Sequence, residues 1–182
     1  MIKVWGEQMH SGRGQCEISL NFMLYFICMV SRVYIDTSVI GGCLDDEFAL
    51  WSKLLFEEFR SGIKIAVISD LTLRELEEAP EGVRKILFEL PSDNVEYVFL
   101  DENVISLADT YIKQGVVSDK YFIDAQHIAL ATIERVDVLV SWNFKQIVNL
   151  DRIRKFNAVN LMQGYQLLEI RSPLEVLYGK EN

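Results

Sequence analysis

Four acidic or amide side chains stand where a parallel sheet would bring them together. Asp36 directly follows the β-branched and aromatic run Val33-Tyr34-Ile35, and Asn143 follows a second apolar run further along the chain. Glu75 and Asp124 lie in segments with helical spacing of their apolar residues. In an open α/β sheet, functional sites gather at the carboxyl ends of the strands. We therefore expect these four side chains to meet at one edge of the sheet.

Converging carboxylates repel each other and are costly to bury unless a cation offsets their charge. A hard ion with oxygen ligands, Mg²⁺ or Mn²⁺, suits such a set, whereas Zn²⁺ and Cu²⁺ fit oxygen ligands less well. Such an ion can activate water and stabilise the charge that grows on a phosphate. The sequence holds two histidines, His10 and His127, and neither has a partner at a zinc-ligand interval. The residues favour a Mg²⁺ or Mn²⁺ site.

Each candidate also has a structural interpretation without catalysis. Asp36 begins the tripeptide Asp-Thr-Ser, which is ordinary turn chemistry, and Glu75 stands in an acidic run that would suit a solvated helix face. Asp124 lies one helical turn before Ile128, so it can share a buried face with that residue. The spacing of His127 from Asp124 allows a pairing but does not require one.

Composition indicates one ordinary domain with a substantial core. The chain has 182 residues, 50% of them hydrophobic, and a net charge of -9. That charge argues against bulk electrostatic attachment to nucleic acid, although bound cations can offset a local carboxylate cluster. The cysteines are odd in number and lack metal-site spacing, which disfavours zinc and predicts reduced thiols in the cytoplasm. They are Cys16, Cys28 and Cys43.

Strand and helix patterns alternate from residue 32 onward. Strands are predicted at 33–35, 63–68, 95–100 and 136–140, with a further short one near Ala158-Val159. Helices are predicted at 47–59, 69–79, 81–90, 101–114, 119–132 and 161–165. Ser69 is expected to cap the helix that carries Glu75, and Ser118 or Asp119 the helix that carries Asp124. The alternation predicts an α/β fold with a parallel sheet and helices on both faces.

Residues 1–30 differ from the rest and are set apart as an N-terminal extension. The apolar run at 20–30 is about half the length that a membrane helix requires. Three interpretations stay open: translation that begins at Met29, an appended hydrophobic segment, or a signal peptide, which the few basic residues and poor cleavage site disfavour. No function is assigned to this segment.

Four segments resemble, in order, the motifs of the PIN-domain family. Residues 33–42 resemble the strand and first acid, 69–76 the second-acid helix, 124–131 the third-acid motif and 139–145 the fourth position. Residues 171–175 resemble the end of the domain in a branch similar to VapC-type toxins. The resemblance runs from about residue 32 to the C-terminus, so we expect a PIN-like nuclease domain at 31–182.

This resemblance implies a three-layer α/β/α fold with an acidic pocket, Mg²⁺ or Mn²⁺, and hydrolysis of RNA phosphodiester bonds. VapC-like members are toxins that a cognate antitoxin inhibits, and they often form homodimers. By position, Asp36, Glu75 and Asp124 would bind metal, and Asn143 would complete the catalytic set. Ser38 and Ser141 would support the site.

One residue departs from the family pattern. The fourth position, often Asp, is Asn143, which can offer an amide oxygen but no charge. The leading hypothesis is an endoribonuclease that is the toxin of a toxin–antitoxin pair. Asn143 and the acidic composition motivate a second one, a catalytically weak or inactive PIN-like module that binds a protein partner or RNA. A DNA nuclease is less favoured, since no long insertion for threading DNA is present.

Overall fold

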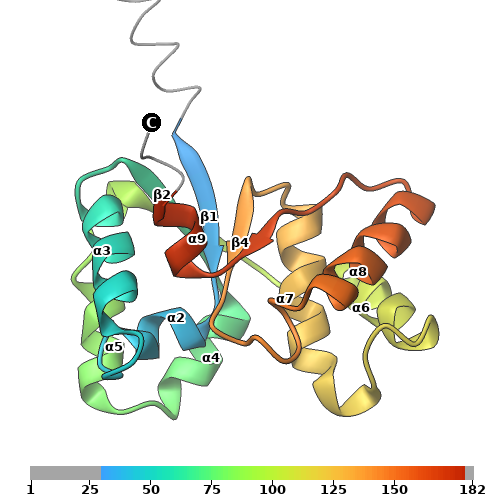
Figure 1. The fold of residues 1–182 in the computed structure, drawn as a ribbon, viewed down its shortest axis with the longest axis horizontal. Coiled ribbons are helices and arrows are strands. Elements are labelled where there is room, and N and C mark those ends of the chain that lie inside the picture. The colour runs from blue at the N-terminus through green and yellow to red at the C-terminus, as the bar shows by residue number, and fades with distance from the viewer. Residues whose placement is uncertain (1–29, 179–182) are drawn as a thin grey trace, which may run out of the picture. The chain divides into compact units, whose positions relative to one another are not determined.

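A computed structural model describes residues 30–178 of the chain, and a central parallel sheet organises them (Figure 1). The predicted extension lies outside the described residues except for Val30. The five strands are ordered β3-β2-β1-β4-β5, and all neighbours pair in parallel. They are β1 (Ser31–Ile35), β2 (Lys64–Ser69), β3 (Val95–Val98), β4 (Val138–Val140) and β5 (Ile170–Arg171).

The central strands are buried on both faces because their side chains alternate between two cores. Tyr34 and Val67 point into one core, whereas Val33, Ile35 and Ala66 point into the other. This pattern explains why the strands read as continuous apolar runs rather than as alternating ones. It also confirms the predicted three-layer α/β/α arrangement.

Helices form the two outer layers, which stand on either side of the strands in Figure 1. One layer contains α6 (Glu102–Lys113), α7 (Phe122–Ile133) and α8 (Leu150–Met162). The other contains α2 (Thr37–Gly42), α3 (Ala49–Arg60), α5 (Glu81–Phe88) and α9 (Pro173–Tyr178). Helix α4 (Asp70–Glu77) contributes to both cores, and η1 (Ser92–Asn94) and η2 (Asp119–Tyr121) are single 3₁₀ turns.

Side-chain caps fix where several helices begin. Ser69 accepts a hydrogen bond from the backbone N–H of Thr72 at 3.1 Å, so the predicted cap of α4 is confirmed. The prediction for α7 was wrong, because η2 intervenes and Tyr121, which makes no side-chain cap, precedes the helix. The cap of α4 matters for function because it sets the position of Glu75 one turn later.

Two other local predictions were also wrong. The segment near Ala158-Val159 is not a strand but the last part of α8, where Phe156, Val159 and Asn160 are buried at helical spacing. The fifth strand lies instead at β5. In addition, the residues after Asp36 form the short helix α2 rather than a turn.

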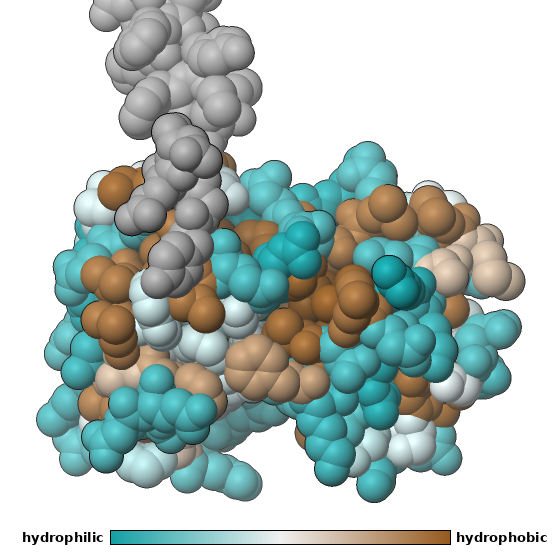
Figure 2. Space-filling model, in the orientation of Figure 1, coloured by the Kyte–Doolittle hydropathy of each residue, from teal (hydrophilic) through white to brown (hydrophobic). Residues whose placement is uncertain are grey.

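The surface mixes polar and apolar side chains, as teal and brown patches in Figure 2 show. Exposed apolar residues include Leu150, Leu161 and Met162 of α8. Within residues 30–178, every helix is too short or too polar to cross a membrane.

Candidate functional site

The four residues singled out from the sequence line one open pocket of about 350 Å³ at the carboxyl edge of the sheet. Asp36 follows β1 directly, Glu75 lies on α4 after β2, and Asn143 follows β4. Asp124 lies in the first turn of α7. The pocket is lined by Asp36, Thr37, Ser38, Glu75, Glu78, Asp124, His127 and Asn143.

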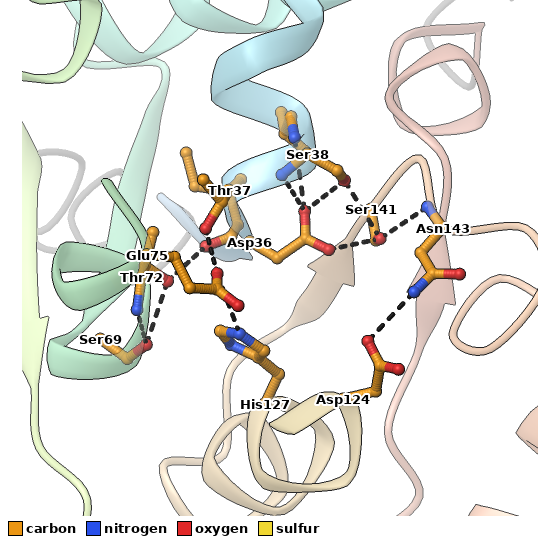
Figure 3. A network of polar contacts seen from close by, with 12 residues as sticks. Asp36, Thr37, Ser38, Ser69, Thr72, Glu75, Asp124, His127, Ser141 and Asn143 are labelled. Atoms are coloured by element: carbon orange, nitrogen blue, oxygen red, sulfur yellow. Dashed lines mark hydrogen bonds and ion pairs between the residues drawn. The ribbon is translucent and has the colours of Figure 1, made fainter. Parts of the chain in front are cut away.

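Asp36 is buried and caps helix α2 (Figure 3). Its Oδ1 accepts from the backbone N–H of Ser38 at 3.1 Å, the Ser38 hydroxyl at 2.5 Å and the Val39 N–H at 3.3 Å. Its Oδ2 accepts from the Ser141 hydroxyl at 2.6 Å, which leaves one lone pair of Oδ2 free. Asp36 therefore caps a helix rather than a turn, and this role leaves part of the acceptor capacity of its carboxylate unused.

Burial raises the pKa of Asp36, although the charge of His127 and the hydrogen bonds from Ser141, Ser38 and Val39 oppose that rise. A carboxylate in this position is costly to ionise. A divalent cation beside it would lower that cost.

Two serines join Asp36 to the segment after β4. The Ser38 hydroxyl accepts from the Trp142 N–H at 2.9 Å, and the Ser141 hydroxyl accepts from the Asn143 N–H at 2.9 Å. Because each serine also donates to Asp36, both hydroxyls are used as donor and acceptor. Ser38 and Ser141 thus hold Asp36 against the segment that follows β4.

Glu75 is turned inward, unlike the exposed Glu77 and Glu78 beside it. The Thr37 hydroxyl donates to its Oε2, while Oε1 accepts no hydrogen bond from any residue between 30 and 178. Burial acts to raise the pKa of Glu75, but the nearby charge of His127 and the hydrogen bond from the Thr37 hydroxyl outweigh it, so the pKa is lowered. Glu75 is therefore held as a carboxylate with one oxygen open to the pocket.

Sequence reasoning left His127 without a role, and the structure gives it two partners. Its Nε2 lies 3.5 Å from Glu75 Oε2, and its Nδ1 lies 2.6 Å from the hydroxyl of Tyr34. Tyr34 is also 2.7 Å from the Ser69 hydroxyl. His127 and Tyr34 are buried, so this chain of contacts joins the cap of α4 to the pocket through the interior.

The donor at the contact of His127 with Tyr34 depends on the tautomer of the ring. The Tyr34 hydroxyl has one hydrogen, which it donates to Ser69 at 2.7 Å or to His127 Nδ1. If it donates to Nδ1, a neutral imidazole carries its hydrogen on Nε2, which faces the Glu75 carboxylate. If it donates to Ser69, Nδ1 donates to Tyr34. At 3.5 Å the contact of Nε2 with Glu75 is a longer electrostatic one rather than a close hydrogen bond.

Asp124 and Asn143 are joined by a hydrogen bond from Nδ2 to Oδ1 at 3.0 Å. The amide oxygen of Asn143 accepts the N–H of Gln146 at 2.9 Å and is turned away from Asp124 (Figure 3). A reversed amide would face oxygen to oxygen and N–H to N–H, so the partners fix its orientation. Asn143 therefore orients Asp124.

The pKa of Asp124 is raised, first by burial and then by the negative charges of Asp36 and Glu75. The charge of His127 and the hydrogen bond from Asn143 oppose this rise. Mutual repulsion among the three acids is thus a property of the folded chain.

The free oxygens fit a hydrated divalent ion. Within residues 30–178, no three Asp, Glu, His or Cys side chains come close enough together to hold one ion directly. Mg²⁺ keeps several of its waters and is usually held by one or two carboxylates. Asp36 Oδ2, Glu75 Oε1 and Asp124 Oδ2 each keep acceptor capacity, so they suit contacts made partly through water.

Comparisons with known proteins give similar folds. No protein-family model matches the sequence, and no curated protein does. Solved structures that are similar include VapC20 of Mycobacterium tuberculosis, described as a sarcin-ricin loop cleaving toxin, at 15% identity and a TM-score of 0.48. That match covers 62% of this chain and 91% of the other.

A second similar structure is VapBC2 of Rickettsia felis, bound to a DNA fragment from its promoter. The identity is 15%, the TM-score is 0.46, and the match covers 78% of this chain and 98% of the other.

Proposed function

We propose that this protein is a metal-dependent endoribonuclease. The observation that carries the proposal is the convergence of Asp36, Glu75 and Asp124 from three separate elements on one pocket whose lining contains no Lys or Arg. Three acids brought together without a lysine or arginine favour a bound cation. The oxygen-only donors favour Mg²⁺ or Mn²⁺.

Each acid has a supporting residue that sets its position. Ser38 and Ser141 hold Asp36, Thr37 and His127 face Glu75, and Asn143 holds Asp124. When bound, the ion would supply an activated water and offset the charge that grows on the phosphate. The lone pairs left free on the three acids would hold that ion and its waters against the scissile phosphate.

Substrate and partner rest on the resemblance of the motifs to VapC-type toxins. We take the substrate to be RNA and the protein to be the toxin of a toxin–antitoxin pair, with a cognate antitoxin and a homodimer as partners.

Asn143 supports a second candidate function, an inactive PIN-like module that binds a protein or RNA. A neutral amide at the fourth position weakens any second metal site. The two functions differ in their response to Mn²⁺, because an ion that binds the folded state raises the melting temperature by mass action. An inert module need not respond.

Cleavage of a panel of structured RNAs tests the proposal. Reactions contain Mn²⁺, Mg²⁺ or EDTA, and compare the wild type with Asp124→Asn and with Asp93→Asn. Asp93 is an exposed acid in η1 at the amino end of β3, so it matches the charge change away from the pocket. We expect metal-dependent cleavage by the wild type and Asp93→Asn, and none by Asp124→Asn. Equal cleavage by all three would remove the proposed site.

A further inference from the structure

Three cationic side chains gather around the ring of Tyr121. Lys120 Nζ lies 4.7 Å from the ring centroid and the guanidinium carbon of Arg152 lies 6.0 Å from it. The positive charge of Lys145 also acts on Tyr121 and lowers its pKa. These residues come from η2, from α8 and from the segment after β4, so the fold assembles the group.

None of these three cations forms a salt bridge within residues 30–178, and the Arg152 guanidinium donates to the Val116 carbonyl at 3.3 Å. Other basic residues do form salt bridges, as shown by Lys64 with Glu58 at 3.0 Å and Lys155 with Asp151 at 2.7 Å. Lys120 and Lys145 are exposed. In a chain of net charge -9, what sets this group apart is that three cations without a salt bridge act on one ring.

The pKa of Tyr121 responds to this environment. It is lowered, first by a hydrogen bond with Lys120, which burial opposes, and then by the positive charges of Lys120, Lys145 and Arg152. The shift agrees with the geometry in placing a positive potential at this ring.

The group lies beside the acidic pocket. Tyr121 directly precedes α7, and Asp124 is one turn further along that helix. Lys145 is two residues beyond Asn143, and the hydrogen bond between Asn143 and Asp124 at 3.0 Å ties the two segments together. The cations therefore flank the pocket on its α7 side.

We propose that Lys120, Tyr121, Lys145 and Arg152 form a cationic edge that binds backbone phosphates of RNA next to the phosphate held in the pocket. The choice of RNA rests on the proposed function. A polyanion is repelled by the chain as a whole, and an ion in the pocket offsets the charge of one phosphate only. Neighbouring phosphates need cations of the protein, and the cationic edge supplies them where the strand must pass.

Salt-dependent binding of a labelled single-stranded RNA in EDTA tests this edge without requiring cleavage. The variant Lys120→Gln/Lys145→Gln is compared with Lys53→Gln/Lys85→Gln, whose exposed lysines lie on α3 and α5 in the opposite layer. Each pair removes two positive charges, so the net charge goes from -9 to -11 in both. Each phosphate contact contributes about 0.7 to the slope of log affinity against log salt.

We expect the edge variant to lose about 1.4 from that slope, two contacts at about 0.7 each, and to bind at least about tenfold more weakly at low salt. The control pair should match the wild type. An unchanged slope in the edge variant, an equal loss in the control, or no RNA binding by the wild type would overturn the cationic edge. The proposed function is judged separately, because cleavage in Mn²⁺ can fail while this binding persists, and the reverse also holds.

Discussion

His127 and Glu75 face each other across the acidic pocket, with Nε2 3.5 Å from Oε2. The imidazole therefore contacts Glu75. It does not hydrogen-bond to Asp124, whose Oδ1 accepts from Asn143 instead. Tyr34 holds the other ring nitrogen at 2.6 Å. This arrangement makes His127 a positioning residue for Glu75.

Replacing His127 with two different amides tests which nitrogen matters. In His127→Gln the amide nitrogen reaches the place of Nε2, and in His127→Asn it reaches only that of Nδ1. We expect His127→Asn to weaken Mn²⁺ binding by about tenfold, in the range seen for residues that orient metal ligands. His127→Gln should bind Mn²⁺ nearly as the wild type does. Equal affinities of the two variants, measured by calorimetry, would exclude a role for Nε2.

The raised pKa of Asp124 predicts that Asp124→Asn stabilises the metal-free protein. The variant keeps an oxygen for the Asn143 donor while it removes the repulsion from Asp36 and Glu75. We expect the melting temperature in EDTA at neutral pH to rise by about 2 °C. In Mn²⁺ the order should reverse, because the wild type gains more from the ion.

The Asp124 carboxyl also determines whether the stability of the folded protein rises or falls with pH. Below its ordinary pKa of 3.8, Asp124 is protonated in both the folded and the unfolded chain, so it does not lower the free energy of unfolding. As pH rises through the raised folded pKa, the unfolded state ionises more readily, so stability is lost. The advantage of Asp124→Asn over the wild type should thus be small near pH 4 and grow toward neutral pH. Melting curves across pH in EDTA measure it, and an advantage that shrinks with pH would contradict the assignment.

Asn143→Asp would place two carboxylates in contact, because Asn143 Nδ2 now lies 3.0 Å from Asp124 Oδ1. Such pairs raise the pKa of one member strongly. We expect a lower melting temperature in EDTA by about 2 °C or more and a larger rise on adding Mn²⁺ than in the wild type. A variant that melts as the wild type does in both conditions would show that the amide does not orient Asp124.

We expect the two adjacent glycines of α2, Gly41 and Gly42, to differ in how well they tolerate replacement by alanine. A Cβ at Gly42 would lie 2.6 Å from Ser52 Oγ and 2.8 Å from Trp142 Nε1, two atoms that share a hydrogen bond of 2.9 Å. A Cβ at Gly41 would meet nothing within 4 Å. We expect Gly42→Ala to destabilise by about 1–3 kcal/mol through overpacking. Gly41→Ala, its matched control, should be neutral or slightly stabilising. Urea denaturation of both proteins decides between them.

Local patterns predicted the parts of this fold that local chemistry determines. The apolar runs gave β1, β2 and β4, and the hydroxyl of Ser69 marked the start of α4. The fifth strand was missed because β5 has two residues, too few for a periodicity. Helix α2 was missed because its paired glycines suggest a flexible loop, whereas burial of Val39 and Ile40 stabilises a helix there.

The partners of the site residues could not be predicted in the same way. Asp36, Glu75 and Asp124 could be placed at one edge because the carboxyl ends of parallel strands meet there. The contacts of His127 with Tyr34 and Glu75 join residues far apart in the sequence, so only the assembled core reveals them. The direction of the Asn143 amide depends on Gln146 and Asp124 together.

We propose above all that Asp36, Glu75 and Asp124 together hold a divalent ion in the pocket. Direct titration of the folded protein with Mn²⁺, followed by the electron paramagnetic resonance of the free ion, tests it in the wild type, Asp124→Asn and Asp93→Asn. We predict that the wild type and Asp93→Asn bind Mn²⁺ at one site per chain with the same affinity, and that Asp124→Asn binds it at least about tenfold more weakly. A wild type that leaves Mn²⁺ free, or binds it no more tightly than Asp124→Asn does, would contradict the claim.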